Sequence, residues 1–132
     1  MEIEITINSS MITSKSVAWG GKNPEFFRAS QEAIREAVQN NPNKEQLKQW
    51  LEDRRKLSMI VEFHLSNQRV HLTDIDSLLA DLLNPLVEGA CGSRFAGKPI
   101  PQTKDALFWQ IHATKINSDE EKVIIKIKPL ED

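Results

Sequence analysis

The sequence predicts one α+β domain over residues 1–132, with a small, largely antiparallel or mixed sheet and helices on one face, in the order β-α-α-β-α-β-β. Two periodicities carry this prediction. Some segments alternate apolar and polar residues, as half-buried strands do, and others repeat apolar residues every three or four positions, as helices do. The composition agrees, because 39% hydrophobic and 27% charged residues in a chain of 132 suit one globular core.

The first half of the chain is expected to contain two strands with two helices between them. Residues 2–8 and 57–65 alternate, so each is expected to form a strand that buries one side. Between them, Asn23 and Pro24 resemble an N-cap followed by proline at the first helical position, and this helix is expected to run to about Asn40. A second, shorter helix follows, and its inner face is expected at Leu47, Trp50 and Leu51.

The second half begins with the most regular helical pattern in the chain. Its apolar residues keep the helical period without a miss, at Ile75, Leu78, Leu79, Leu82, Leu83 and Leu86. Gly89 is placed to terminate this helix. Residues 88–104 show no periodicity and predict a long loop, of a length that is usually functional or mobile.

Two strands are expected to close the chain as an antiparallel hairpin. Residues 117–121 supply the turn between them. The apolar faces of the two strands are expected at Leu107, Trp109, Ile111 and Ala113, and at Val123, Ile125 and Ile127.

The cysteine content and the N-terminal segment bear on the compartment. Cys91 is the only cysteine, so no disulfide forms within the chain, and no Cys-His spacing supports a nucleophile over an inert thiol. The N-terminal residues are acidic where a signal peptide is basic, and no apolar run reaches the length of a membrane span. We therefore expect a cytoplasmic protein without membrane association. The net charge of −2 argues mildly against nucleic-acid binding, unless basic residues gather locally.

Asp74 and Asp76 stand one residue apart where a strand passes into the most regular helix. Two carboxylates at such a junction can converge on one cation, and Mg²⁺ commonly takes one or two carboxylates together with waters and substrate phosphates. The alternative is structural, because Thr73 and Asp76 have capping-box spacing and acids are favoured at helix starts. On spacing alone, capping is favoured over metal binding. Asp105 similarly has an ordinary interpretation as a turn residue before a strand.

The stretch from Asp74 to Lys115 resembles the core of the RusA-type Holliday junction resolvases, or crossover junction endodeoxyribonucleases. That family carries a D-x-D-N-x-x-K-x-x-x-D-A-L helix motif, followed by a D-D turn and a strand that ends in a basic residue. Here residues 74–86 read DIDSLLADLLNPL, Lys104-Asp105-Ala106 follows, and Lys115 lies ten residues beyond Asp105. The order of elements also matches over most of the chain.

The resemblance implies a homodimeric, Mg²⁺-dependent (or Mn²⁺-dependent) endonuclease that resolves four-way DNA junctions in recombination and repair. By position, Asp74, Asp76 and Asp105 would be the catalytic metal ligands. The metal would polarise a phosphodiester oxygen and activate the attacking water. DNA contacts are expected from Lys15, Arg69, Lys104 and Lys115.

The chain also departs from the family pattern. Ala80 stands where the family has its active-site lysine, and Ser77, Asn84 and Lys104 replace an asparagine and two aspartates. The rival hypothesis is therefore a catalytically impaired protein of this fold that acts as a DNA-binding or protein-interaction module.

Other residues invite a functional role from their type alone. For His64 and His112, surface or packing roles are favoured, because neither has a metal-ligand partner at the required spacing. Trp19 is a candidate to stack on a base, whereas Trp50 and Trp109 are expected in the core.

Overall fold

The protein is described from a computed structural model that covers residues 1–8, 24–66, 70–71, 74–92 and 107–130. The elements follow the predicted order, and the α+β fold class is confirmed. They are β1 (Ile3–Ile7), α2 (Pro24–Gln39), α3 (Lys44–Glu52), β2 (Leu57–Leu65), α5 (Ile75–Cys91), β3 (Phe108–Asn117) and β4 (Lys122–Pro129).

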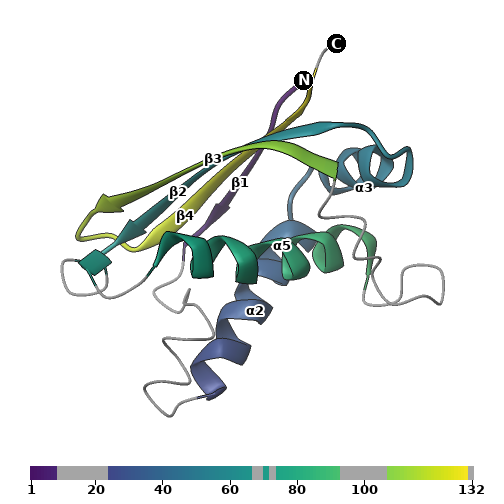
Figure 1. Ribbon diagram of the computed structural model, residues 1–132. Helices are drawn as coiled ribbons and strands as arrows, with labels where there is room; N and C mark the ends of the chain where they lie inside the picture. The colour runs from purple at the N-terminus through teal and green to yellow at the C-terminus, as the bar shows by residue number, and fades with distance from the viewer. Residues whose placement is uncertain (9–23, 67–69, 72–73, 93–106, 131–132) are drawn as a thin grey trace.

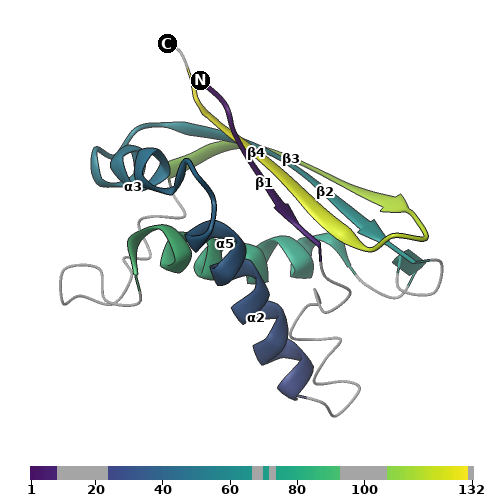
Figure 2. The ribbon, with the colours of Figure 1, turned by 180° about the vertical axis from the view of Figure 1, so that it is seen from behind.

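The four strands form one mixed sheet in the order β1-β4-β2-β3. β4 pairs antiparallel with β1 and with β2, whereas β3 pairs parallel with β2. The three helices lie on one face of this sheet, and the opposite face, which we call the open face, carries no helix among the described residues (Figures 1 and 2).

The expected hairpin between the last two strands is wrong. β2 lies between β3 and β4, so the two strands that are consecutive in sequence are not paired. The connecting residues cross the end of β2, where the Ser118 amide donates to the Leu65 carbonyl at 2.9 Å. A segment of this length can step over one strand, because neighbouring strands are only about 5 Å apart. Turn length alone therefore could not distinguish a hairpin from a crossover.

The hydrophobic core lies between the inner face of the sheet and the helices. The alternation predicted for β1 is observed, since Ile3, Ile5 and Ile7 are buried and the residues between them are exposed. In β2 every second residue from Leu57 to Leu65 is buried, and Ser58 is buried as well. The short helix α3 buries the three residues expected of it, Leu47, Trp50 and Leu51. Burial of this apolar surface is the main force that holds helices and sheet together.

Gly89 does not terminate α5, which continues to Cys91 and is capped by Gly92 at φ 86°. The predicted loop therefore begins later than residue 88. Gly89 instead lies where α5 crosses α2. A Cβ placed there would be 2.7 Å from Val38 Cβ and 2.8 Å from the Arg35 carbonyl oxygen. The glycine is needed for this close approach of the two helices.

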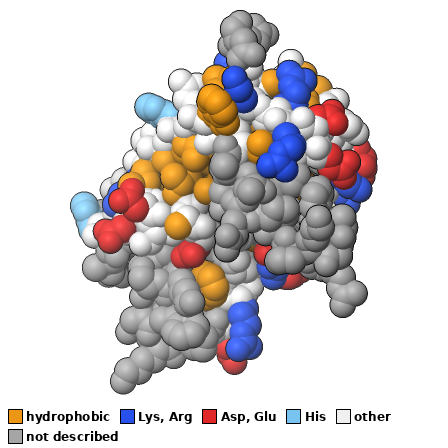
Figure 3. Space-filling model, turned by 45° about the vertical axis from the view of Figure 1, so that its right-hand side comes forward, with side chains coloured by type: hydrophobic (Ala, Val, Ile, Leu, Met, Phe, Trp, Pro, Cys, Tyr) orange, Lys and Arg blue, Asp and Glu red, His pale blue; other side chains and the backbone are white. Residues whose placement is uncertain are grey.

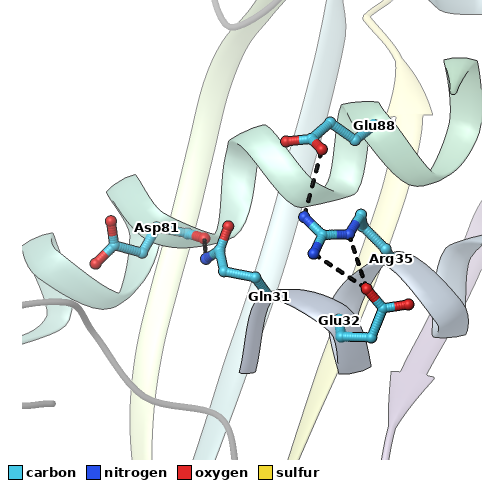
Figure 4. Close-up of polar contacts among 5 residues, drawn as sticks. All are labelled: Gln31, Glu32, Arg35, Asp81 and Glu88. Atoms are coloured by element: carbon cyan, nitrogen blue, oxygen red, sulfur yellow. Dashed lines mark hydrogen bonds and ion pairs between the residues drawn. The ribbon is translucent and has the colours of Figure 1, made fainter. Parts of the chain in front are cut away.

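A proline inside α5 is compensated by a side chain from α2. Pro85 has no N–H, so the carbonyl of Asp81, four residues earlier, loses its helical donor. Gln31 Nε2 donates to this carbonyl oxygen at 2.8 Å. One face of the same contact is charged: Arg35 bridges Glu32 at 3.1 Å and Glu88 at 3.3 Å (Figure 4).

Trp109 is not in the core, contrary to expectation. β3 is irregular at its start, where Leu57 pairs with Phe108 but Ser58 pairs with Gln110. Trp109 is the extra residue of this bulge, and its side chain is 63% exposed. A bulge shifts the alternation by one residue, so the inward positions before and after it do not share one parity.

We expect Gly89→Ala to lower the free energy of unfolding by about 1–2 kcal/mol. The added methyl group overpacks the α2–α5 contact, which typically costs about 1–3 kcal/mol, while alanine regains up to about 1 kcal/mol of helix propensity. Chemical denaturation measures the difference. Asn84→Ala, at an exposed position of the same helix, is the control and should be neutral or slightly stabilising. An unchanged stability of Gly89→Ala would show that the two helices separate freely.

We expect Gln31→Met to lower stability by about 1 kcal/mol, because a partly buried carbonyl loses its donor. In a Pro85→Ala background the alanine N–H can donate to Asp81, so the same Gln31 change should cost only a few tenths of a kcal/mol. A double-mutant cycle by urea denaturation measures this coupling. Equal costs in the two backgrounds would contradict the compensation.

Candidate metal centre

Asp74 and Asp76 lie at the start of α5. Asp74 is the N-cap residue, with extended backbone angles (φ −74°, ψ 135°), and Asp76 lies in the first turn. The first helical hydrogen bond runs from the Leu78 amide to the Asp74 carbonyl at 3.1 Å. Both aspartates are exposed. The two carboxylates therefore lie within one turn of helix.

The structure does not support side-chain capping by Asp74. Its side chain makes no cap hydrogen bond, and among the described residues neither Asp74 nor Asp76 has a hydrogen-bond or ion-pair partner for its carboxylate. Thr73, the other member of the proposed capping box, lies outside the described residues. The helix dipole still favours acids at this end. Within the part of the chain that the structure describes, no side chain or backbone group thus occupies either carboxylate.

Asp105 lies outside the described residues, so the structure does not test whether its carboxylate lies near Asp74. Its closest described neighbours are Leu107 and Phe108, at the start of β3. Phe108 and Lys115 are seven residues apart on that strand, roughly 23 Å at the usual rise per residue. The start of α5 is near the Lys115 end. The described flank of Asp105 is therefore at the other end of the sheet from Asp74.

Lys115 connects the sheet to the segment before α5. It is half-buried, and its Nζ donates to the Val70 carbonyl at 2.7 Å. This contact places the end of β3 beside the residues that lead into Asp74. Lys115 thus helps to position the segment that leads into α5.

The positions that depart from the resolvase motif lie along α5. Ala80 and Asn84 are exposed, and Ser77 is half-buried. The face that would carry the family's lysine therefore carries a methyl group. Among the residues that the structure describes, no group of three or more His, Cys, Asp or Glu side chains is arranged to hold a metal ion. A cation at Asp74 and Asp76 would complete its coordination with water or substrate oxygens, as Mg²⁺ often does.

Lys15, Trp19, Arg69 and Lys104 all lie outside the described residues. The interpretation of the two histidines is consistent with the structure. His64 lies half-buried on the open face, 3.1 Å from a Glu62 carboxylate oxygen, and His112 is exposed there.

Sequence reasoning missed a group of cations at the far end of the sheet. Arg55 and Lys128 line a shallow pocket of about 320 Å³, and Lys56 lies against Trp109. The run Arg54-Arg55-Lys56 was visible in the sequence. The position of this run beside β4 and the bulge of β3 could not be predicted, because that position depends on the order of the strands in the sheet.

Comparisons with known proteins do not identify a family for this chain. No protein-family model matches it, and no curated protein matches it. No helix within the described ranges has the length and apolar character needed to cross a membrane.

We expect Mn²⁺ or Mg²⁺ to raise the melting temperature of the protein through Asp74 and Asp76. At a metal concentration of about ten times the dissociation constant, ligand binding adds about 1.4 kcal/mol, or about 5 °C for a domain of this size. Asp74→Asn and Asp76→Asn should each abolish the shift. Asp119→Asn, at an exposed aspartate between β3 and β4, should keep it. Identical shifts in all four proteins would mean that the metal binds elsewhere.

Proposed function

We propose that this protein is a divalent-metal-dependent endonuclease that acts on branched DNA, with Asp74 and Asp76 as ligands of Mg²⁺ or Mn²⁺. The observation that carries the proposal is the pair of exposed carboxylates at the start of α5, which have no partner among the described residues. The resemblance of residues 74–86 and 104–115 to the RusA-type resolvases supplies the substrate class.

The chemistry of the site fits a hard divalent cation. Two carboxylates alone repel a phosphodiester, whereas a bound divalent ion reverses the local charge. When bound, the metal would supply Lewis-acid polarisation of the phosphodiester and a water of lowered pKa. The chain itself contributes the two carboxylates, held on the rigid start of a helix that is packed against the sheet. The amides of the first turn, which lack helical acceptors, can donate to a phosphate oxygen nearby.

Asp105 is proposed as the third ligand on the resemblance alone, and Lys15, Arg69, Lys104 and Lys115 as DNA contacts on the same ground. A homodimer in the cytoplasm belongs to the same proposal, because symmetric cuts in two strands require two equivalent sites. β3 offers one seam for such a dimer. It is an edge strand of the described sheet, and an open edge can pair with a second chain.

A second function is favoured by specific observations. Ala80 removes the cation that the family uses, and the described neighbours of Asp105 lie at the opposite end of β3 from Lys115. A site of two carboxylates that lacks this lysine would be weak in stabilising transition-state charge. The alternative is a protein of this fold that binds branched DNA, or a protein partner, without cutting.

We expect the purified protein to nick a labelled four-way junction symmetrically in Mn²⁺ or Mg²⁺. Asp74→Asn or Asp76→Asn should lower the cleavage rate at least about 100-fold, since even outer-shell changes cost metal sites about 10- to 100-fold. Asparagine is also a good N-cap, so the fold should persist. Denaturing gels measure the cuts, with Asp119→Asn and a linear duplex as controls.

The outcomes separate the two functions. Metal-dependent paired cuts that need both aspartates support the endonuclease. Tight junction binding without cleavage in either metal supports the binding module. Cleavage that survives loss of Asp74 sinks the proposed mechanism.

A further inference from the structure

The end of the sheet farthest from Asp74 carries a cluster of basic and aromatic side chains that is not part of the proposed metal site. It consists of Arg55, Lys56, Lys128 and Trp109, and we call it the basic rim. Its members come from the α3–β2 connection, from β4 and from the bulge of β3. Figure 3 shows Lys and Arg side chains beside hydrophobic ones on the upper part of this side of the molecule.

The turn after α3 holds two of these cations in place. The Arg55 amide donates to the Trp50 carbonyl at 3.0 Å, and the Arg54 amide donates to the Leu51 carbonyl at 3.3 Å. This pair of bonds is a Schellman motif, with Arg54 in the left-handed region at φ 56°. A glycine is usual at that position. The motif terminates α3, and Arg55 and Lys56 therefore lie immediately before the start of β2.

The sheet register brings the other members alongside. Lys128 of β4 pairs with Ser58 of β2, and Ser58 pairs with Gln110, the neighbour of Trp109. The Ser58 hydroxyl lies 3.1 Å from Gln110 Oε1 and fixes this row. Two strand spacings separate Lys128 from Gln110, roughly 10 Å. A few nucleotides of a single strand cover this span.

The aromatic member is exposed in spite of its size. The Trp109 side chain is 63% exposed, and Lys56 Nζ lies 4.4 Å from its ring centroid. A cation over a tryptophan ring is a favourable contact that also orients the ring. One face of the ring is thereby held by Lys56, and the exposed remainder is a flat apolar surface beside positive charge.

A pocket at the same end of the sheet is lined by two cations. Arg55 and Lys128 line it together with the amide-bearing Gln46 and the buried Trp50. Neither Arg55 nor Lys128 makes a side-chain hydrogen bond or ion pair with another described residue. Two unpaired cations lining one concave surface attract an anionic group such as a phosphate.

We propose that the basic rim binds single-stranded nucleic acid, with a base stacked on Trp109 and backbone phosphates held by Arg55 and Lys128. Exposed aromatic rings beside a positive groove are the two features by which proteins hold single strands without sequence preference. On the open face, Glu4 lies on the edge strand β1, Glu2 just precedes it, and Glu62 lies on β2 four residues beyond Ser58. The proposed path of the bound nucleic acid therefore runs from β4 across the start of β2 to β3. This surface does not depend on the proposed metal site.

The test is binding of fluorescent oligo(dT) and oligo(rU) by anisotropy, in EDTA, so that metal chemistry cannot contribute. Trp109→Ala should weaken binding roughly tenfold, whereas Trp109→Phe, which keeps a π-face, should retain most of it. The Arg55→Gln/Lys128→Gln variant should reduce the slope of log K against log salt by about 1.4, because each phosphate contact contributes about 0.7 for single strands.

A second measurement follows the tryptophan directly. Quenching of intrinsic fluorescence by unlabelled oligo(dT) should disappear in Trp109→Phe.

The controls separate this surface from general charge effects. Arg28→Gln removes an exposed cation from α2, which contributes no residue to the rim, and this variant should bind as the unmodified protein does. Asp74→Asn should bind normally even if it abolishes junction cleavage, so the two proposals fail independently. Binding to either oligonucleotide with the expected variant pattern supports the rim, and the ratio of the two affinities reports the preferred sugar. Absence of binding at low salt, unchanged binding by Trp109→Ala, or equal losses in Arg28→Gln would each overturn it.

Discussion

The parallel pairing of β2 with β3 is the constraint on which the arrangement of this molecule depends. Two parallel neighbours need a crossover, and α5 supplies it by running back along the sheet against the direction of both strands. The start of α5 therefore lies near the ends of β2 and β3, as the contact from Lys115 to Val70 shows. The residues that follow α5 must return to the start of β3. This path of the chain determines which side chains can meet.

The crossover also explains why α5 is so firmly attached to α2. A helix that covers the middle of the sheet must itself be covered on its outer side, and α2 does this at the cost of a very close approach at Gly89. The proline in α5 leaves the Asp81 carbonyl without its helical donor, and Gln31 replaces the missing bond at the same interface. The ion pairs of Arg35 add little where they are exposed to water. Packing and the partly buried hydrogen bond from Gln31, more than charge, thus fix the helix that presents Asp74 and Asp76.

The sequence predicted those features that depend on local periodicity. Ile3, Ile5 and Ile7 face the core because a half-buried strand buries alternate residues. The inner face of α3 was predicted correctly because a helix buries residues three and four positions apart. The position of Asp74 at a helix start was also predictable. Features that depend on tertiary pairing were missed. Trp109 turns outward at a bulge that alternation cannot reveal, and β4 lies beside β1 because its fully buried inner face suits the middle of the sheet.

The distribution of charge along the sheet argues against judging this protein by its net charge. The carboxylates of Asp74 and Asp76 are at one end, while Arg55, Lys56 and Lys128 are at the other, and the total of −2 averages over the two. At physiological ionic strength the Debye length is about 8 Å, so groups separated by the length of β3 scarcely influence each other. A phosphate approaching the basic rim therefore responds to the local cations and not to the distant acids. By the same screening, the cations of the rim would scarcely repel the divalent ion that is proposed at Asp74 and Asp76.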